Sequence, residues 1–119
     1  MTKISFIGLG RMGLPMARNL KNAGYDILAF DINNDILNKA KLEGIKITES
    51  IDNIATDSEI IITMVPTGKH VLEIYTGRNG LFSKMVTGTI AVDCSTISIA
   101  ETQLFHEEAK KYNIKTLDA

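Results

Sequence analysis

The sequence has little of several features whose abundance would indicate particular protein classes. One cysteine in 119 residues excludes an internal disulfide and is typical of a chain kept in a reducing compartment. The net charge is −1 and no basic stripe runs along the chain, so we expect no nucleic-acid partner. No apolar stretch approaches the roughly 20 residues of a membrane span, so we expect no membrane partner either.

What the chain does have is enough length and apolar content for one packed domain. Its composition is 45% hydrophobic, which is ordinary for a globular protein. A chain of this size is expected to bury about 65% of its unfolded surface, so we predict one domain over residues 1–119. Because the first expected strand begins at Lys3, we also expect no leader peptide and a cytoplasmic location.

Strand and helix signals alternate along the whole chain. Strands are expected over residues 3–7, 26–30, 45–47, 59–64, 89–93 and from 115 onward, and helices over 12–23, 33–43, 50–55, 69–75 and 98–112. In the first helix the expected buried stripe is Met12, Pro15, Met16, Leu20 and Ala23. The alternation predicts an α/β fold of the Rossmann type, a doubly wound and mostly parallel sheet with helices on both faces.

The turn between the first strand and the first helix has glycine at its first, third and sixth positions, over residues 8–13. In that order, the glycines allow a tight turn, a close backbone approach to a pyrophosphate, and close packing of helix on strand. The start of the helix would present N–H groups and a partial positive charge to the pyrophosphate. We therefore predict a dinucleotide-binding loop made of Gly8, Leu9, Gly10, Arg11, Met12 and Gly13.

An acid at the end of the second strand indicates which dinucleotide is bound. Asp31 follows the apolar run over 27–30, about 20 residues after the glycine-rich turn. Its carboxylate can accept hydrogen bonds from the adenosine ribose, and the same charge repels a 2′-phosphate. The next three residues include no Arg to bind that phosphate. The predicted cofactor is therefore NAD rather than NADP.

Two more strand ends carry polar or turn-forming residues. The segment 64–67 follows the fourth expected strand, and the segment 93–96 follows the fifth. Because the carboxyl ends of parallel strands meet at one edge, we expect both segments to line a single crevice with the glycine-rich turn and Asp31. In the second segment we expect Ser95 and Thr96 to contact a ligand, since Ser98 is the better start for the helix that follows.

The segment Phe6–Leu20 resembles the N-terminal signature of the β-hydroxyacid dehydrogenases. Segments 63–67, 75–81 and 93–97 also resemble that family, and the closest resemblance is to the branch acting on 3-hydroxyisobutyrate. The resemblance spans the whole chain. It implies that the cofactor is also contacted by Met64, Val65, Pro66 and Thr96, and that the substrate is contacted by Ser95 and Thr96.

The resemblance implies a reversible hydride transfer between NAD and the hydroxyl carbon of a small 3-hydroxy acid. In the family, a glycine-rich substrate segment and a helical domain follow the point that matches Ala119, and a lysine there is the general acid/base. We therefore expect no catalytic residue within residues 1–119 and no turnover by this chain alone. Contacts between subunits are expected to involve that further domain.

Other interpretations stay open at this point. A sibling 2-hydroxy-3-oxopropionate reductase would have a nearly interchangeable first half, whereas the 6-phosphogluconate branch is disfavoured by Asp31. A stand-alone, non-catalytic NAD-binding module that works through a partner chain is a further alternative. No metal site is expected, because His70, His106 and Cys94 lack the spacing of metal ligands. Cys94 is expected to be a small buried residue.

Overall fold

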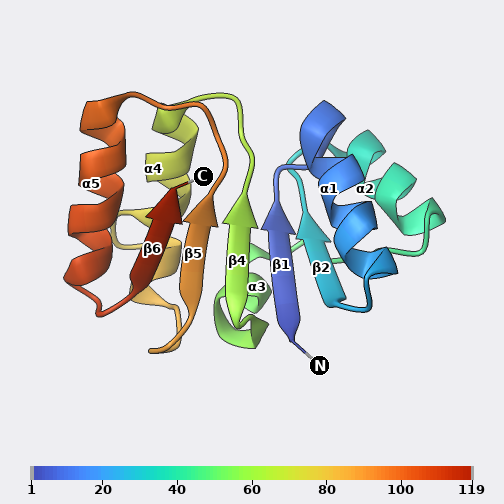
Figure 1. The fold of residues 1–119 in the computed structure, drawn as a ribbon, viewed down its shortest axis with the longest axis horizontal. Helices are drawn as coiled ribbons and strands as arrows, with labels where there is room; N and C mark the ends of the chain where they lie inside the picture. Colours follow the sequence, from blue (N-terminus) through green and yellow to red (C-terminus); the bar gives the residue numbers. More distant parts are fainter. Residues whose placement is uncertain (1, 119) are drawn as a thin grey trace.

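Six parallel strands form the centre of the computed structural model, which describes residues 2–118 (Figure 1). The strands are β1 (Lys3–Ile7), β2 (Asp26–Phe30), β3 (Lys46–Ile47), β4 (Ile60–Thr63), β5 (Ile90–Asp93) and β6 (Lys115–Asp118). They lie in the order β3-β2-β1-β4-β5-β6, and every neighbouring pair is parallel. The chain winds outward from β1 in one direction and then from β4 in the other. The predicted doubly wound fold is therefore confirmed, with its switch point between β1 and β4.

Helices cover both faces of this sheet. They are α1 (Gly10–Asn22), α2 (Asn34–Leu42), α3 (Ile51–Asp57), α4 (Gly68–Tyr75) and α5 (Ile99–Lys110), with a short 3₁₀ helix η1 (Leu81–Ser83). On one face, α1 and α2 pack on β1 and β2 through Leu14, Ala17, Leu37 and Ala40. On the other face, α3, α4, α5 and η1 pack on β4 and β5. The helices α1, α4 and α5 each begin beside the carboxyl ends of the strands, so the loops after β1, β4 and β5 lie together at this edge of the sheet (Figure 1).

A cluster of three aromatic rings, with one stacked pair and one edge-to-face pair, joins α4, η1 and α5 beneath that edge. Tyr75 lies 4.8 Å from Phe82 and 5.0 Å from Phe105, centroid to centroid, and all three are fully buried. Aromatic pairs at such distances contribute about 0.5–1.5 kcal/mol each beyond the area that they bury. The sequence pattern did not predict η1, which places Phe82 in this cluster.

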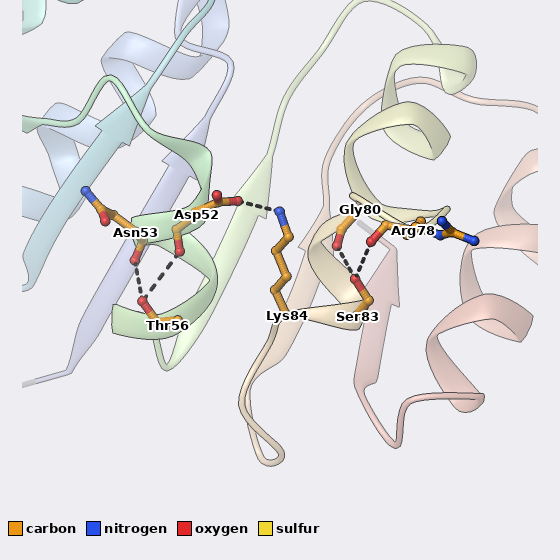
Figure 2. Close-up of polar contacts among 7 residues, drawn as sticks. All are labelled: Asp52, Asn53, Thr56, Arg78, Gly80, Ser83 and Lys84. Atoms are coloured by element: carbon orange, nitrogen blue, oxygen red, sulfur yellow. Dashed lines mark hydrogen bonds and ion pairs between the residues drawn. The ribbon is translucent and has the colours of Figure 1, made fainter.

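Polar contacts near the amino end of β4 secure the connection from α4 to β5 (Figure 2). Lys84, directly after η1, forms an ion pair of 2.6 Å with Asp52 on α3. The Ser83 hydroxyl donates to the carbonyl oxygens of Gly80 at 2.9 Å and Arg78 at 3.2 Å. An exposed ion pair contributes at most about 1 kcal/mol to the free energy of unfolding, so the main effect of these contacts is to define the local turn.

The first helix faces the sheet with a different stripe from the expected one. It begins at Gly10, and its buried residues are Gly13, Leu14 and Ala17. Met16 and Leu20 pack against the same cluster as expected, but the prediction was wrong for Met12, Pro15 and Ala23, which are exposed. The cause is steric: a Cβ at Gly13 would lie 2.1 Å from the carbonyl oxygen of Gly8. Only the glycine side of the helix can approach β1 so closely, and this sets the rotation of the whole helix.

Replacing Gly8 by alanine tests how strongly this turn constrains the fold. Gly8 has φ +89°, and an added Cβ would lie 2.2 Å from the Met64 carbonyl oxygen. We expect Gly8→Ala to lower the free energy of unfolding by about 3 kcal/mol or more, from the left-handed backbone and the clash together. Gly88→Ala is the matched control, because Gly88 has φ +100° with no heavy atom within 4 Å of the added Cβ. We expect Gly88→Ala to lower the free energy of unfolding by about 1–2 kcal/mol. If urea unfolding gave equal losses for the two variants, the steric argument would be contradicted.

Candidate cofactor-binding cleft

A cleft of about 850 Å³ opens at the carboxyl edge of the sheet, across the switch point between β1 and β4. It brings together almost all of the cofactor contacts predicted from the sequence, namely Gly8, Leu9, Gly10, Arg11, Met12, Gly13, Asp31, Met64, Val65 and Pro66. The strand ladder continues into this rim, because Gly8 N–H donates to Phe30 at 3.0 Å and Met64 N–H donates to Ile7 at 2.9 Å. The rim loops are thus held by the same hydrogen bonds as the sheet.

The three glycines of the first turn differ in what surrounds them. A Cβ at Gly8 or Gly13 would meet backbone atoms at 2.2 or 2.1 Å, whereas a Cβ at Gly10 would meet nothing within 4 Å. Gly10 also has φ +35° and is exposed at the first position of α1. This leaves an open backbone surface at a helix N-terminus, where free N–H groups favour an anion. The cradle fits a pyrophosphate.

The Asp31 carboxylate connects this turn to the next one. Its Oδ2 accepts a hydrogen bond from Leu9 N–H at 2.8 Å, and its Oδ1 accepts one from Asn33 N–H at 2.9 Å. Each carboxylate oxygen has a second acceptor position, so both remain able to accept from ribose hydroxyls. Asp31 therefore organises the glycine-rich turn as well as facing the cleft. The sequence pattern indicated only the second of these roles.

A buried polar chain supports the cleft on its β4–β5 side. The Tyr75 hydroxyl donates to Thr63 Oγ1 at 3.4 Å, and the Thr63 hydroxyl donates to Asp93 Oδ1 at 2.7 Å. Ser95 N–H donates to the same Asp93 oxygen at 3.3 Å, while Ser95 Oγ accepts from Val65 N–H at 2.8 Å. The chain of bonds thus runs from α4 through both strand ends to Val65. It holds the loop after β4 in place at the rim of the cleft.

Burial raises the pKa of two groups, one within this chain of hydrogen bonds and one beside it. It raises the pKa of Tyr75 far above its usual value, so the Tyr75 hydroxyl keeps its proton and acts as a donor. Burial, and then the nearby Asp93, also raise the pKa of the half-buried Cys94 thiol. The thiol form therefore predominates at neutral pH, and Cys94 is a poor nucleophile there.

Ser95 and Thr96 are not among the residues that line the cleft. Ser95 is buried and bonded to Val65, and Thr96 is exposed. In this structure Ser95 is a positioning residue, and the substrate contact inferred from the resemblance stays a prediction for both.

Several lining residues were missed from the sequence. They include Phe30, Ile32, Asn33, Glu49, His70, Glu73 and Asn79. Glu49 lies two residues after the end of the short strand β3. The expectation that ligand-binding residues follow the carboxyl ends of strands could therefore have identified it.

The family match agrees with this geometry. Residues 3–119 match the family described as the NAD binding domain of 6-phosphogluconate dehydrogenase. The chain belongs to this family. The resemblance to dehydrogenases and the predicted cofactor, NAD, are thereby confirmed for this NAD-binding domain.

Relatives with assigned activities extend well beyond the matched region. The domain is 35% identical to 3-hydroxyisobutyrate dehydrogenase, mitochondrial, of Mus musculus, over 99% of this chain and 35% of that protein. It is 34% identical to NAD-dependent L-serine dehydrogenase of Pseudomonas aeruginosa, over 100% of this chain and 40% of that protein. The chain thus spans 35–40% of the length of these relatives.

The fold of the domain is also that of a solved relative. A structure of Mycobacterium tuberculosis 3-hydroxyisobutyrate dehydrogenase with L-serine superposes with a TM-score of 0.93 at 34% identity. The match covers 100% of this chain and 40% of that one. Within residues 2–118 of the NAD-binding domain, no helix has the length and apolar character to cross a membrane.

Two variants at Asp93 test the buried polar chain. Asp93 is 1% exposed, and its Oδ2 has no hydrogen-bond partner in the described part of the chain. We expect Asp93→Ala to lower the free energy of unfolding by about 2–4 kcal/mol, because it leaves the Thr63 hydroxyl and Ser95 N–H unpaired. Asp93→Asn keeps an acceptor oxygen for both donors, so its expected loss is within about 1 kcal/mol. Equal losses for both variants in denaturant unfolding would show that the acceptor is unimportant.

Proposed function

We propose that this chain supplies the NAD-binding half of an enzyme that oxidises a small 3-hydroxy acid. The observation that carries the proposal is the single cleft that joins an open glycine-rich turn, a strand-end carboxylate and the loop after β4. The mouse and Mycobacterium tuberculosis relatives support the substrate class, because both are 3-hydroxyisobutyrate dehydrogenases. NAD, when bound, accepts or returns the hydride. The protein's own contribution is to bind and orient it.

Different parts of the cleft would hold different parts of the dinucleotide. Gly10 and the first N–H groups of α1 would bind the pyrophosphate, and Asp31 would accept from the adenosine ribose hydroxyls. The nicotinamide half would lie across the switch point, beside Met64, Val65 and Pro66. Because Asp93 and Ser95 hold Val65 in place, the wall on that side is preorganised before the cofactor arrives.

L-serine is a second candidate substrate within the same class. It too carries a hydroxyl on its third carbon, and two relatives connect it to this family: the Pseudomonas aeruginosa enzyme is an L-serine dehydrogenase, and the Mycobacterium tuberculosis structure includes L-serine. A sibling reductase and a non-catalytic NAD-binding module stay as alternatives. A cytoplasmic location and subunit contacts through a further domain also stay predictions.

The first test is the choice between NAD⁺ and NADP⁺. We expect the chain to bind NAD⁺ at least about tenfold more tightly than NADP⁺, because Asp31 repels a 2′-phosphate. Asp31→Asn should narrow that preference by roughly tenfold, because it removes the charge but keeps one acceptor. It is a cleaner test than Asp31→Arg, which would also leave the N–H groups of Leu9 and Asn33 without their acceptor. Titration calorimetry measures all four affinities, and equal binding of both cofactors by the unsubstituted chain would contradict the assignment.

The second test is turnover. We expect the 119-residue chain to form no NADH above background from 3-hydroxyisobutyrate, L-serine or glycerate. Oxidation of an alcohol needs a positioned base, and losing it typically costs 10²–10⁴-fold in rate. The family resemblance implies that this base is a lysine outside these residues. NADH absorbance at high protein concentration is the measurement, with NAD⁺ binding by the same sample as the control. Saturable turnover would contradict this expectation, and His70→Ala would then test the imidazole that lines the cleft.

A further inference from the structure

A second carboxylate lies beside Asp31 at the edge of the sheet. In the parallel pair β2·β3, Leu28 is aligned with Lys46, and Ala29 with Ile47. Continued two residues beyond these pairs, past the ends of both strands, the same register aligns Asp31 with Glu49, and both residues line one hollow. Aligned residues of neighbouring parallel strands lie roughly 5 Å apart at the backbone and direct their side chains to the same face. The continued register and the shared hollow place the two acids beside each other, although they are 18 positions apart in the sequence.

Hydrogen bonds hold Glu49 at this place after β3 has ended. Thr48 N–H donates to the Ala29 carbonyl at 3.0 Å, which extends the ladder by one residue. The Thr48 hydroxyl then accepts from Ser50 N–H at 3.1 Å and from the Asn53 side-chain amide at 3.3 Å. The residues on both sides of Glu49 are therefore tied to β2 and to the start of α3. Its backbone position is set by the fold.

Both acids line the same hollows. Glu49 and Asp31 line the large cleft, and both also line a smaller hollow of about 340 Å³ beside it, together with Phe30, Ile32, Asn34 and Leu37. Among residues 2–118, the smaller hollow has two carboxylates in its lining and no Lys, Arg or His. Arg11 and His70 line only the large cleft. A phosphate group on the 2′-oxygen of a ribose bound at Asp31 would meet this doubly acidic wall.

We propose that Glu49 is a second specificity residue, which acts with Asp31 to exclude nucleotides that carry a 2′-phosphate. This inference rests on the proposed NAD-binding function. Asp31 accepts from the ribose and is also tied to two backbone N–H groups, whereas no hydrogen bond from the described residues engages the exposed Glu49 side chain. Glu49 thus acts through its charge alone. Across several ångströms of water, one unit charge facing a phosphate of nearly two charges changes affinity by roughly fivefold.

Two small nucleotides isolate this effect from the rest of the cofactor. 2′,5′-ADP and 5′-AMP share the adenosine and the 5′-phosphate, and only the first carries a 2′-phosphate. Amide chemical-shift titrations of the 119-residue chain give both dissociation constants, even where binding is weak. The readout is the ratio of the constant for 2′,5′-ADP to that for 5′-AMP. We expect Glu49→Gln to lower this ratio about fivefold at low salt, and the difference to shrink as added salt screens the charge.

Glu107→Gln is the matched control, because Glu107 is an exposed acid on α5 and lines neither hollow. It makes the same change in net charge and should leave the ratio unchanged. A ratio that stays the same in Glu49→Gln while 5′-AMP still binds would overturn the inference and leave the proposed function standing. If the unsubstituted chain bound neither 5′-AMP nor NAD⁺, the proposed function would be wrong, and the role of Glu49 would be overturned with it.

Discussion

The arrangement of this protein depends on one close approach between backbones at the end of β1. Gly13 lies against the carbonyl of Gly8, and Gly8 lies against the carbonyl of Met64, with no room for a Cβ at either glycine. Through the first contact, α1 is brought down onto β1 and its rotation is set. Through the second, the loop after β4 is brought beside the glycine-rich turn. The cleft forms because the end of β1, the start of α1 and the loop after β4 approach one another more closely than any residue with a Cβ would allow.

Polar groups then hold the walls of the cleft that the glycines bring together. On one side, Asp31 bridges two turns through the N–H groups of Leu9 and Asn33. On the other, Asp93 gathers Thr63 and Ser95, and Ser95 reaches Val65. The hydrogen bonds of Asp93 are buried and therefore expensive to leave unmade, so the wall on that side has one favoured geometry. On each side, a residue that was expected to contact the ligand, Asp31 or Ser95, also holds a neighbouring loop by hydrogen bonds.

Much of the fold was predictable because local signals agree with one another. The bounds of β1 and β2 match the expectation residue for residue, and Asn33 caps α2 through the N–H groups of Asp35 and Ile36 as its position suggests. The site was predictable where it follows strand ends, as at Asp31 and Met64. Periodicity failed for Met12, because the rotation of α1 is decided by contact with β1 rather than by the distribution of apolar residues in the helix. It also gave no sign of η1.

By itself, the sequence determined the element types, the parallel sheet and the position of the dinucleotide fingerprint, since these depend on glycine placement and apolar patterns within single segments. Tertiary structure alone decided which side chains meet. Ser95 bonds to Val65 because β4 and β5 are neighbours, and Glu49 joins Asp31 because of the register between β2 and β3. Distances between segments depend on packing and strand register. Neither is encoded in the residues of any one segment, and the electrostatics of the cleft follows from both.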